Sequence, residues 1–164
     1  MKCVSVVGSD GRIPKNVREA AEYVGGKIAE AGCVLVCGGR GGVMEAACRG
    51  AKKKGGITVG ILPTLNKKEA NKHVDIILTT SLGYSRNSLV ASASDALIAV
   101  GGNIGTLSEI ALALNFDKPV VVVEGLGGVG EKIPDEYKTE KTRHRIHKAG
   151  KEGAVEKALS LISP

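Results

Sequence analysis

Aromatic residues are nearly absent from this sequence of 164 residues, which has no Trp, one Phe and three Tyr. Proteins that read RNA or single-stranded DNA usually stack bases on aromatic side chains. The shortage argues against nucleic acid as a partner, although the net charge is +6. Long apolar runs are also missing, and none approaches the ~20 residues of a membrane-spanning helix. We therefore expect a cytoplasmic protein with no membrane partner.

Several sequence signatures are missing as well. No G-x-x-x-x-G-K-[ST] motif occurs, which argues against an ordinary P-loop ATPase or GTPase. The four cysteines form no C-x-x-C pair and have no histidine at metal-ligand spacing, so we expect buried thiols in a reducing compartment and no metal site. Polar and charged residues come too early in the chain for a secretory signal peptide; they are Ser9, Asp10, Arg12 and Lys15.

Short apolar runs alternate with amphipathic stretches along the whole chain. The composition, 43% hydrophobic and 24% charged, is that of an ordinary globular protein, and we expect a single domain over residues 1–164. The apolar runs predict strands over Cys3–Val7, Val34–Cys37, Ile57–Leu62, Val74–Leu78, Ala96–Val100 and Pro119–Val123, with an edge strand near Arg143–Lys148. The amphipathic stretches predict helices over Pro14–Ala31, Val43–Lys54, Ser85–Ser92, Thr106–Asn115 and Glu152–Ile162.

Strands that are apolar throughout and are separated by helices indicate a parallel sheet covered on both faces. Right-handed crossovers then give a Rossmann-like, doubly wound α/β fold. In such folds a ligand binds outside the carboxyl ends of the strands, where the strand order switches direction. Most of the glycine clusters follow predicted strands, so we expect them to line a ligand site.

Two glycine turns stand out because each joins a strand to a helix. Four glycines occur within the five residues 38–42, which suggests either a ligand lying against the backbone or a plain tight turn. The second turn, Gly101-Gly102-Asn103-Ile104-Gly105, opens a helix whose free N–H groups suit a phosphate. Thr106 adds a hydroxyl donor. Glu109 has two interpretations, catalysis or a capping box with Thr106.

A cation stands where the next predicted helix begins. Arg86 near a helix N-terminus is unfavourable unless it faces an anion or a carboxylate, and the alternative is an ordinary surface residue. The G-x-G-x-x-G run over residues 125–130 matches a dinucleotide fingerprint, but Pro134 follows closely and we predict a loop. Residues 138–151 carry six cations and one anion, a charge of +5, which could help to hold an anionic ligand.

These residues together resemble the LOG ("lonely guy", lysine-decarboxylase-like) superfamily. The resemblance rests on Gly-Gly-x-x-Gly-Thr-x-x-Glu over residues 101–109 and on Gly-Gly-Arg-Gly-Gly-Val-Met-Glu over residues 38–45. It runs from Cys3 to about Val123. The segments Leu82–Asn87 and Ser94–Gly102 are similar to the branch that includes molybdenum cofactor carrier proteins.

The resemblance implies a homodimer or higher homo-oligomer and a nucleoside 5′-monophosphate phosphoribohydrolase, which splits its substrate into base and ribose 5-phosphate. Glu109 would act on the ribose, and Arg86 would orient the ribose or the phosphate. No cofactor is implied. Alternatives are a non-catalytic carrier of a phosphorylated pterin and a nucleotide sensor or DNA-processing accessory. The remaining ligand-binding candidates are Gly8, Ser9, Gly39, Gly41, Gly42, Met44, Asn87, Gly101, Gly102, Gly105 and Thr106.

The sequence departs from the hydrolase pattern of this superfamily at two places, and from the carrier-like branch at one. Val100 stands where a proline is usual before Gly-Gly. The basic motif Met-His-x-Arg-Lys is replaced by Gly83-Tyr-Ser-Arg-Asn87, without its His or Lys, and Asn103 replaces a glycine common in the carrier-like branch. The carboxylate of Glu109 and the guanidinium of Arg86 are kept, whereas the His and Lys of the motif are not. We therefore expect nucleotide binding, and the sequence leaves open whether the protein hydrolyses the nucleotide.

Overall fold

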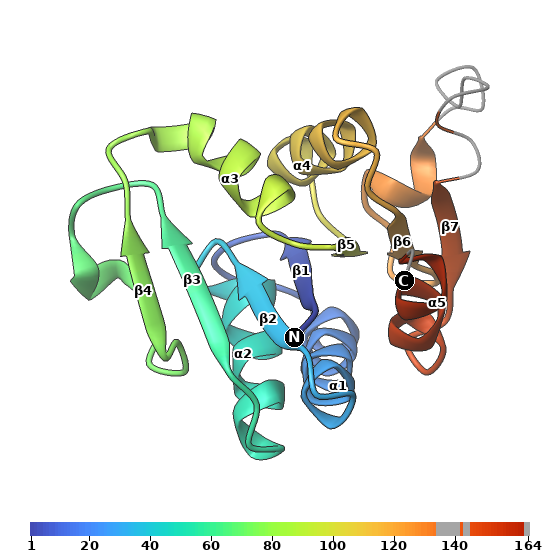
Figure 1. The fold of residues 1–164 in the computed structure, drawn as a ribbon, viewed down its shortest axis with the longest axis horizontal. Coiled ribbons are helices and arrows are strands. Elements are labelled where there is room, and N and C mark those ends of the chain that lie inside the picture. The colour runs from blue at the N-terminus through green and yellow to red at the C-terminus, as the bar shows by residue number, and fades with distance from the viewer. Residues whose placement is uncertain (134–141, 143–144, 163–164) are drawn as a thin grey trace.

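The structure is a computed structural model that describes residues 1–133, 142 and 145–162. Seven strands form one sheet in the order β4-β3-β2-β1-β5-β6-β7 (Figure 1). Every neighbouring pair is parallel, which confirms the predicted fold class. The strands are β1 (Cys3–Gly8), β2 (Val34–Cys37), β3 (Thr58–Leu62), β4 (Ile76–Thr79), β5 (Ala96–Val100), β6 (Val120–Val123) and β7 (Ile146–Ala149).

Helices cover both faces of the sheet, as expected of a doubly wound fold (Figure 1). One face carries α1 (Lys15–Glu30), α2 (Gly42–Lys53) and α5 (Ala154–Leu161), and the other carries α3 (Asn87–Ser92) and α4 (Ile104–Asn115). Each layer has its own apolar core, because strand side chains alternate between the two faces. No helix in the described part of the chain is long and apolar enough to cross a membrane.

The direction in which successive strands are added to the sheet switches at β1. This strand pairs with β2 on one side and with β5 on the other, so the chain builds outward to β4 and then returns to the centre. At the switch the carboxyl ends of β1, β2 and β5 lie side by side and lead into the turns that begin at Gly8, Gly38 and Gly101. The fold therefore has a switch point of the kind at which the ligand is predicted to bind.

Some predicted boundaries were wrong. The helix predicted over Ser85–Ser92 is a 3-10 turn, η2 (Gly83–Arg86), followed by α3. The edge strand is confirmed as β7, but it begins at Ile146, and Arg143 lies outside the described residues. Residues 125–130 form a loop, as predicted, and Val129 N–H donates to the Gly102 carbonyl at 3.2 Å, so this loop braces the turn after β5.

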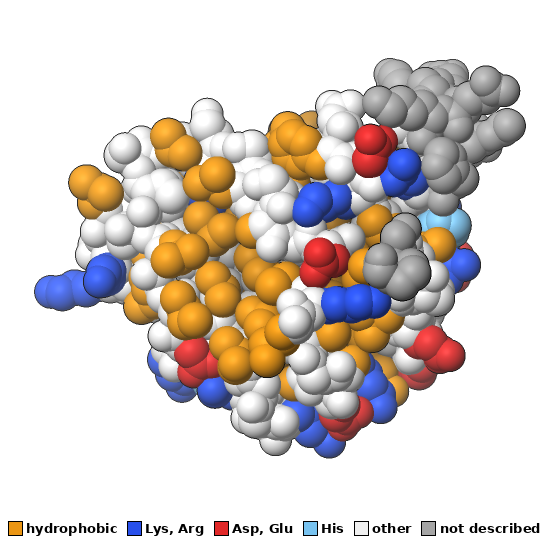
Figure 2. Space-filling view, in the orientation of Figure 1, with side chains coloured by type: hydrophobic (Ala, Val, Ile, Leu, Met, Phe, Trp, Pro, Cys, Tyr) orange, Lys and Arg blue, Asp and Glu red, His pale blue; other side chains and the backbone are white. Residues whose placement is uncertain are grey.

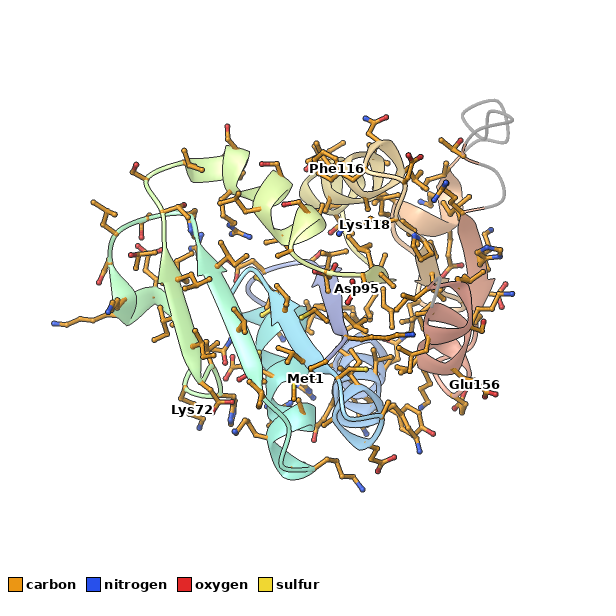
Figure 3. The ribbon with its side chains drawn as sticks, in the orientation of Figure 1. Met1, Lys72, Asp95, Phe116, Lys118 and Glu156 are labelled. Atoms are coloured by element: carbon orange, nitrogen blue, oxygen red, sulfur yellow. The ribbon has the colours of Figure 1, made fainter. Side chains whose placement is uncertain are left out.

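Two side chains secure the segment between α3 and β5, and Figure 3 labels both of them. The Asp95 carboxylate accepts a hydrogen bond of 2.8 Å from the backbone N–H of Cys3. Lys118 Nζ donates to the carbonyls of Ser92 and Ser94. A cation at the carboxyl end of a helix satisfies carbonyls that have no partner within the helix. These bonds fix the position of β5, whose end carries the glycine turn.

Apolar side chains gather on one face of the molecule, over the region of β2, β3 and β4 (Figure 2). On the edge strand β4, Ile76 and Leu78 are 48% and 47% exposed. Apolar patches on a protein surface commonly mark contacts with other molecules. The homodimer or higher homo-oligomer stays a prediction.

Helices α1 and α2 pack with their backbones almost in contact, which yields a stability prediction. A Cβ atom on Gly25 would lie 1.9 Å from the Ala47 carbonyl oxygen, whereas one on the adjacent Gly26 would meet nothing nearer than 3.5 Å. Gly25→Ala should therefore lower the free energy of unfolding by about 1–3 kcal/mol, because the helices must separate. Gly26→Ala is the matched control and should be neutral or stabilising by up to about 1 kcal/mol. Urea denaturation measures both, and equal effects would contradict the close packing.

Candidate functional site

A cleft of about 1050 Å³ opens at the switch point. Its walls come from the end of β1, from the turn after β2 with the start of α2, from η2 with the start of α3, and from α4. Seven of the predicted site residues line it: Gly8, Met44, Arg86, Asn87, Gly105, Thr106 and Glu109. The structure thus brings four separate segments of the chain together at one ligand-sized cleft.

Arg86 lies at the base of this cleft, and its side chain is only 8% exposed. Its guanidinium occupies space that a side chain at position 38 would fill, since a Cβ atom on Gly38 would lie 2.3 Å from Arg86 Nη1. The Nε atom is buried and has no hydrogen-bond partner among the described residues. Burial lowers the pKa of the guanidinium, and the carboxylate of Glu109 opposes this effect. Arg86 therefore offers a poorly solvated cation with free donor capacity.

Glu109 supplies the opposing charge from α4. Its side chain is 6% exposed and lines the same cleft. Burial raises the pKa of the Glu109 carboxyl to about 7, and the positive charge of Arg86 limits the rise. A carboxyl with this pKa exchanges its proton near neutral pH, as general acids and bases do. Arg86 and Glu109 thus line one cleft and influence each other's pKa, and the roles predicted for them stay predictions.

The capping-box interpretation of Thr106 and Glu109 is wrong. The helix begins at Ile104 with Asn103 as its N-cap residue, so Thr106 and Glu109 are both inside α4. Thr106 is 2% exposed, and its hydroxyl oxygen has no hydrogen-bond partner among the described residues. The first turn of α4 contains no acidic residue. No side chain caps this end of the helix by a hydrogen bond, so its first N–H groups are free, and the Thr106 hydroxyl lies among the residues that line the cleft beside them.

Asn87 connects the two walls that carry Arg86 and Glu109. Its side-chain nitrogen donates to Ser108 Oγ at 2.9 Å and to the Gly105 carbonyl at 3.5 Å. Ser108 Oγ in turn donates to the same carbonyl at 2.6 Å. These bonds hold the start of α3 against the first turns of α4. Asn87 lines the cleft, but its side-chain N–H donors already bond to Ser108 and Gly105.

The other predicted site residues are not among those that line the cleft, and they belong to the turns beside it. In the turn after β5, Gly102 has φ +98°, and a Cβ atom there would lie 2.3 Å from Thr106 Oγ1. In the turn before α2, the Ser9 carbonyl accepts the N–H of Val43 at 3.0 Å. The predicted residues that do not line the cleft are Ser9, Gly39, Gly41, Gly42, Gly101 and Gly102.

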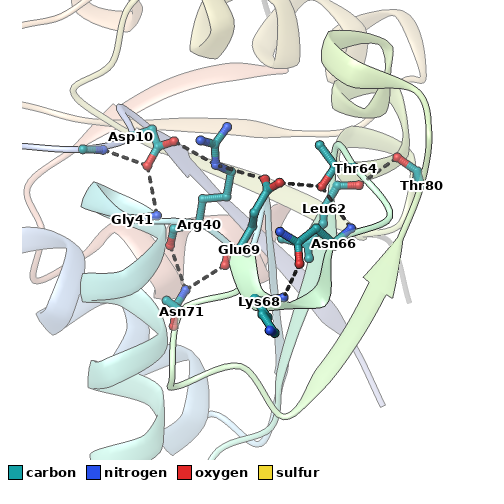
Figure 4. A network of polar contacts seen from close by, with 12 residues as sticks. Asp10, Arg40, Gly41, Leu62, Thr64, Asn66, Lys68, Glu69, Asn71 and Thr80 are labelled. Carbon is teal, nitrogen blue, oxygen red and sulfur yellow. Dashed lines mark hydrogen bonds and ion pairs between the residues drawn. The ribbon is translucent and has the colours of Figure 1, made fainter.

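Sequence reasoning missed a charged network at the rim (Figure 4). Asp10 accepts from the N–H of Gly41 at 3.0 Å and pairs with Arg40 Nε at 3.2 Å, and Arg40 lies 3.9 Å from Glu69. Both Asp10 and Arg40 line the cleft. Their place in the sequence, one directly after Ser9 and the other inside the glycine cluster, is the only signal that could have found them.

The same network ties down the loop between β3 and β4, which contains the 3-10 turn η1 (Lys67–Glu69). Glu69 accepts from Thr64 Oγ1 at 2.8 Å, and Asn71 Nδ2 donates to the Arg40 carbonyl at 2.8 Å (Figure 4). The N–H of Asn71 also donates to the Gly39 carbonyl at 2.8 Å. The loop is thus bonded to the glycine turn that precedes α2.

The basic segment over residues 138–151 is described only in part, and Lys138, Lys141 and Arg143 lie outside the described residues. Arg145 lies 3.5 Å from Asp117, and Lys148 Nζ donates to the Glu131 carbonyl at 3.3 Å. In the part of the chain that the structure describes, no group of three or more His, Cys, Asp or Glu side chains is arranged to hold a metal ion.

The fold and the cleft define a Rossmann-like α/β protein whose charged site lies at the switch point of the sheet. The chain belongs to the SLOG cluster4 family, whose model matches residues 1–156. The family match agrees with the resemblance of its sequence motifs to LOG proteins.

Three proteins illustrate what this chain is similar to. An uncharacterized protein of Archaeoglobus fulgidus is 46% identical over 75% of this chain and 84% of its own. A cytokinin riboside 5′-monophosphate phosphoribohydrolase of Mycobacterium tuberculosis is 34% identical over 66% of this chain, and the chain spans 63% of that protein's length. The molybdenum cofactor binding protein of Rippkaea orientalis superposes with a TM-score of 0.88 at 35% identity, over 99% of this chain and 98% of its own.

Proposed function

We propose that the cleft binds a nucleoside 5′-monophosphate and hydrolyses its N-glycosidic bond, which releases the base and ribose 5-phosphate. The observation that carries the proposal is the buried pair of Glu109 and Arg86, placed beside the free hydroxyl of Thr106. The similarity to a cytokinin riboside 5′-monophosphate phosphoribohydrolase supports it. The cleft, at about 1050 Å³, has room for a nucleotide-sized ligand.

The N-terminal turn of α4 would hold the phosphate. A Cβ atom on Gly105 would meet nothing within 4 Å, so the backbone there is open to a ligand, and Thr106 adds its hydroxyl. Free N–H groups and the positive end of the helix dipole both favour an anion at this place. A phosphate anchored there would position the ribose for reaction between Glu109 and Arg86.

The chemistry requires a stabilised cation at the sugar. As the bond between C1′ and the base nitrogen breaks, positive charge develops on the ribose ring, and a nearby carboxylate stabilises it. Glu109 in its ionised form would fill this role, while water adds to C1′ and the base leaves with a proton. With a pKa raised to about 7, Glu109 exchanges between its ionised and its protonated form near neutral pH.

A second candidate function is a carrier that binds a phosphorylated pterin such as molybdenum cofactor without cleaving it. Nearly the whole chain superposes on a molybdenum cofactor binding protein, which favours this alternative. The missing His and Lys in the segment Gly83–Asn87 agree with a site that binds and does not hydrolyse.

A base-release assay tests the two functions against each other. The purified protein is incubated with AMP, GMP, CMP, UMP and IMP, and free base is measured by chromatography. Release from at least one nucleotide is the expected result. Release from none of them by folded protein would overturn the hydrolase, and saturable binding of a phosphorylated pterin by the same preparation would then establish the carrier.

Gly38→Ala should weaken nucleotide binding through Arg86. The new methyl group would occupy the position of the guanidinium, which must then leave its place. Loss of a hydrogen bond to a charged group corresponds to about 10–100-fold in affinity. Calorimetric titration with AMP measures the change. Gly153→Ala is the control, because a Cβ atom there meets nothing within 4 Å and the residue does not line the cleft; equal affinity of the two variants would refute this role of Gly38.

A further inference from the structure

Two buried cysteines that the proposed reaction does not use lie in contact directly behind the cleft. Cys37 is the last residue of β2, and Cys48 is on α2. Both side chains are 0% exposed, and their sulfur atoms are 3.5 Å apart. Both thiols are free in the structure. Because Gly38 follows Cys37 directly, this pair adjoins the backbone on which Arg86 rests.

The surroundings of the two sulfur atoms are unequal. Cys37 Sγ accepts the N–H of Gly39 at 3.3 Å and is in hydrogen-bond contact with the Cys48 thiol. The hydrogen bond between the two thiols is the largest influence that lowers the pKa of Cys37; the Gly39 N–H and the charge of Arg86 add to it against burial. The same hydrogen bond, together with burial, raises the pKa of Cys48. Of the two sulfur atoms, Cys37 Sγ therefore has the better support for a negative charge, from the Gly39 N–H and from its contact with the Cys48 thiol.

We propose that Cys37 and Cys48 form a reversible redox site, at which a peroxide converts the two thiols into a disulfide. The Cys37 thiolate attacks one oxygen of hydrogen peroxide, the O–O bond breaks, and hydroxide leaves and takes the thiol proton as water. The resulting sulfenic acid on Cys37 is then attacked by Cys48 Sγ. The S–O bond breaks, a second water leaves with the Cys48 proton, and the S–S bond forms. Two electrons pass from the sulfurs to the peroxide.

Disulfide formation must disturb the turn after β2. The two sulfur atoms have to approach by about 1.5 Å to reach bonding distance. Cys37 Sγ then leaves the N–H of Gly39, whose backbone is held tightly because a Cβ atom there would lie 3.1 Å from Gly60 Cα. The strain is transmitted to Gly38, against which the Arg86 guanidinium packs. Oxidation would therefore move Arg86 and weaken ligand binding, a consequence that rests on the proposed function.

The experiment counts thiols in the folded, full-length protein. The protein is treated with hydrogen peroxide, quenched, unfolded, alkylated and mapped by mass spectrometry without reduction. The number of alkylated thiols should fall from four to two, with one cross-linked pair of peptides that contain Cys37 and Cys48, and dithiothreitol should restore all four. Four thiols after treatment, or a different pair, would overturn the proposal.

Variants separate the chemistry from its consequence. Cys48→Ser should trap a sulfenic acid on Cys37 that dimedone labels when the treated protein is unfolded, whereas Cys33→Ser should still form the disulfide. Oxidised wild-type protein should bind AMP about tenfold or more weakly than reduced protein, and unchanged affinity would remove the coupling to Arg86. If reduced protein binds no nucleotide, the proposed function fails, while the thiol count still decides the redox site.

Discussion

Glu109→Gln should lower kcat for base release by about 10²–10⁴-fold, the range expected when a positioned catalytic carboxyl group is removed. The amide keeps the size of the side chain in its buried position but cannot ionise and carries no charge to stabilise the ribose cation. Binding of the phosphate at the start of α4 uses other groups, so KM should change much less than kcat.

The assay for this variant is the chromatographic measurement of free base, with KM and kcat determined separately. Glu45→Gln is the matched control, because it removes a half-buried glutamate from the first turn of α2 that does not line the cleft. Its kcat should equal that of the wild type. A Glu109→Gln variant with wild-type kcat would show that the carboxylate takes no part in the reaction.

The sequence allowed the frame of the site to be predicted, because local signals specify it. Strands that are apolar on both faces can be accommodated only in a parallel sheet covered by helices, and the glycine turns then follow from the ends of those strands. Arg86 was singled out because a cation is unfavourable where a helix begins. The structure resolves this conflict with burial beside Gly38 and with the charge of Glu109.

What could not be predicted depends on distances between segments far apart in the chain. Gly38 looked like one of several turn glycines, and only the packing shows that its missing side chain leaves room for Arg86. Cys37 and Cys48 are 11 positions apart and meet because α2 lies back across the end of β2. A capping box with Glu109 was a possible interpretation because the helix was predicted to begin at Thr106, whereas α4 begins at Ile104.

The buried state of Glu109 should also make the stability of the protein depend on pH in a way that the Glu109→Gln variant does not share. The pKa of this carboxyl is about 7 in the folded protein against an ordinary value of 4.5. A raised pKa means that folding favours the protonated form of Glu109. The contribution of this group to stability is therefore fully present below pH 4.5 and is lost as the pH rises through 7. The neutral amide that the substitution introduces resembles the protonated carboxyl at every pH.

The measurement is urea denaturation of wild type and Glu109→Gln at pH 5 and at pH 8. From pH 5 to pH 8 the free energy of unfolding of the variant, relative to that of the wild type, should rise by about 2–3 kcal/mol. Glu45→Gln, measured in parallel, controls for the loss of one negative charge. Parallel pH curves for wild type and Glu109→Gln would mean that the carboxylate is well solvated or fully paired in solution. A gain of the expected size would show that the fold maintains a destabilising carboxylate in the cleft, which is typical of catalytic sites.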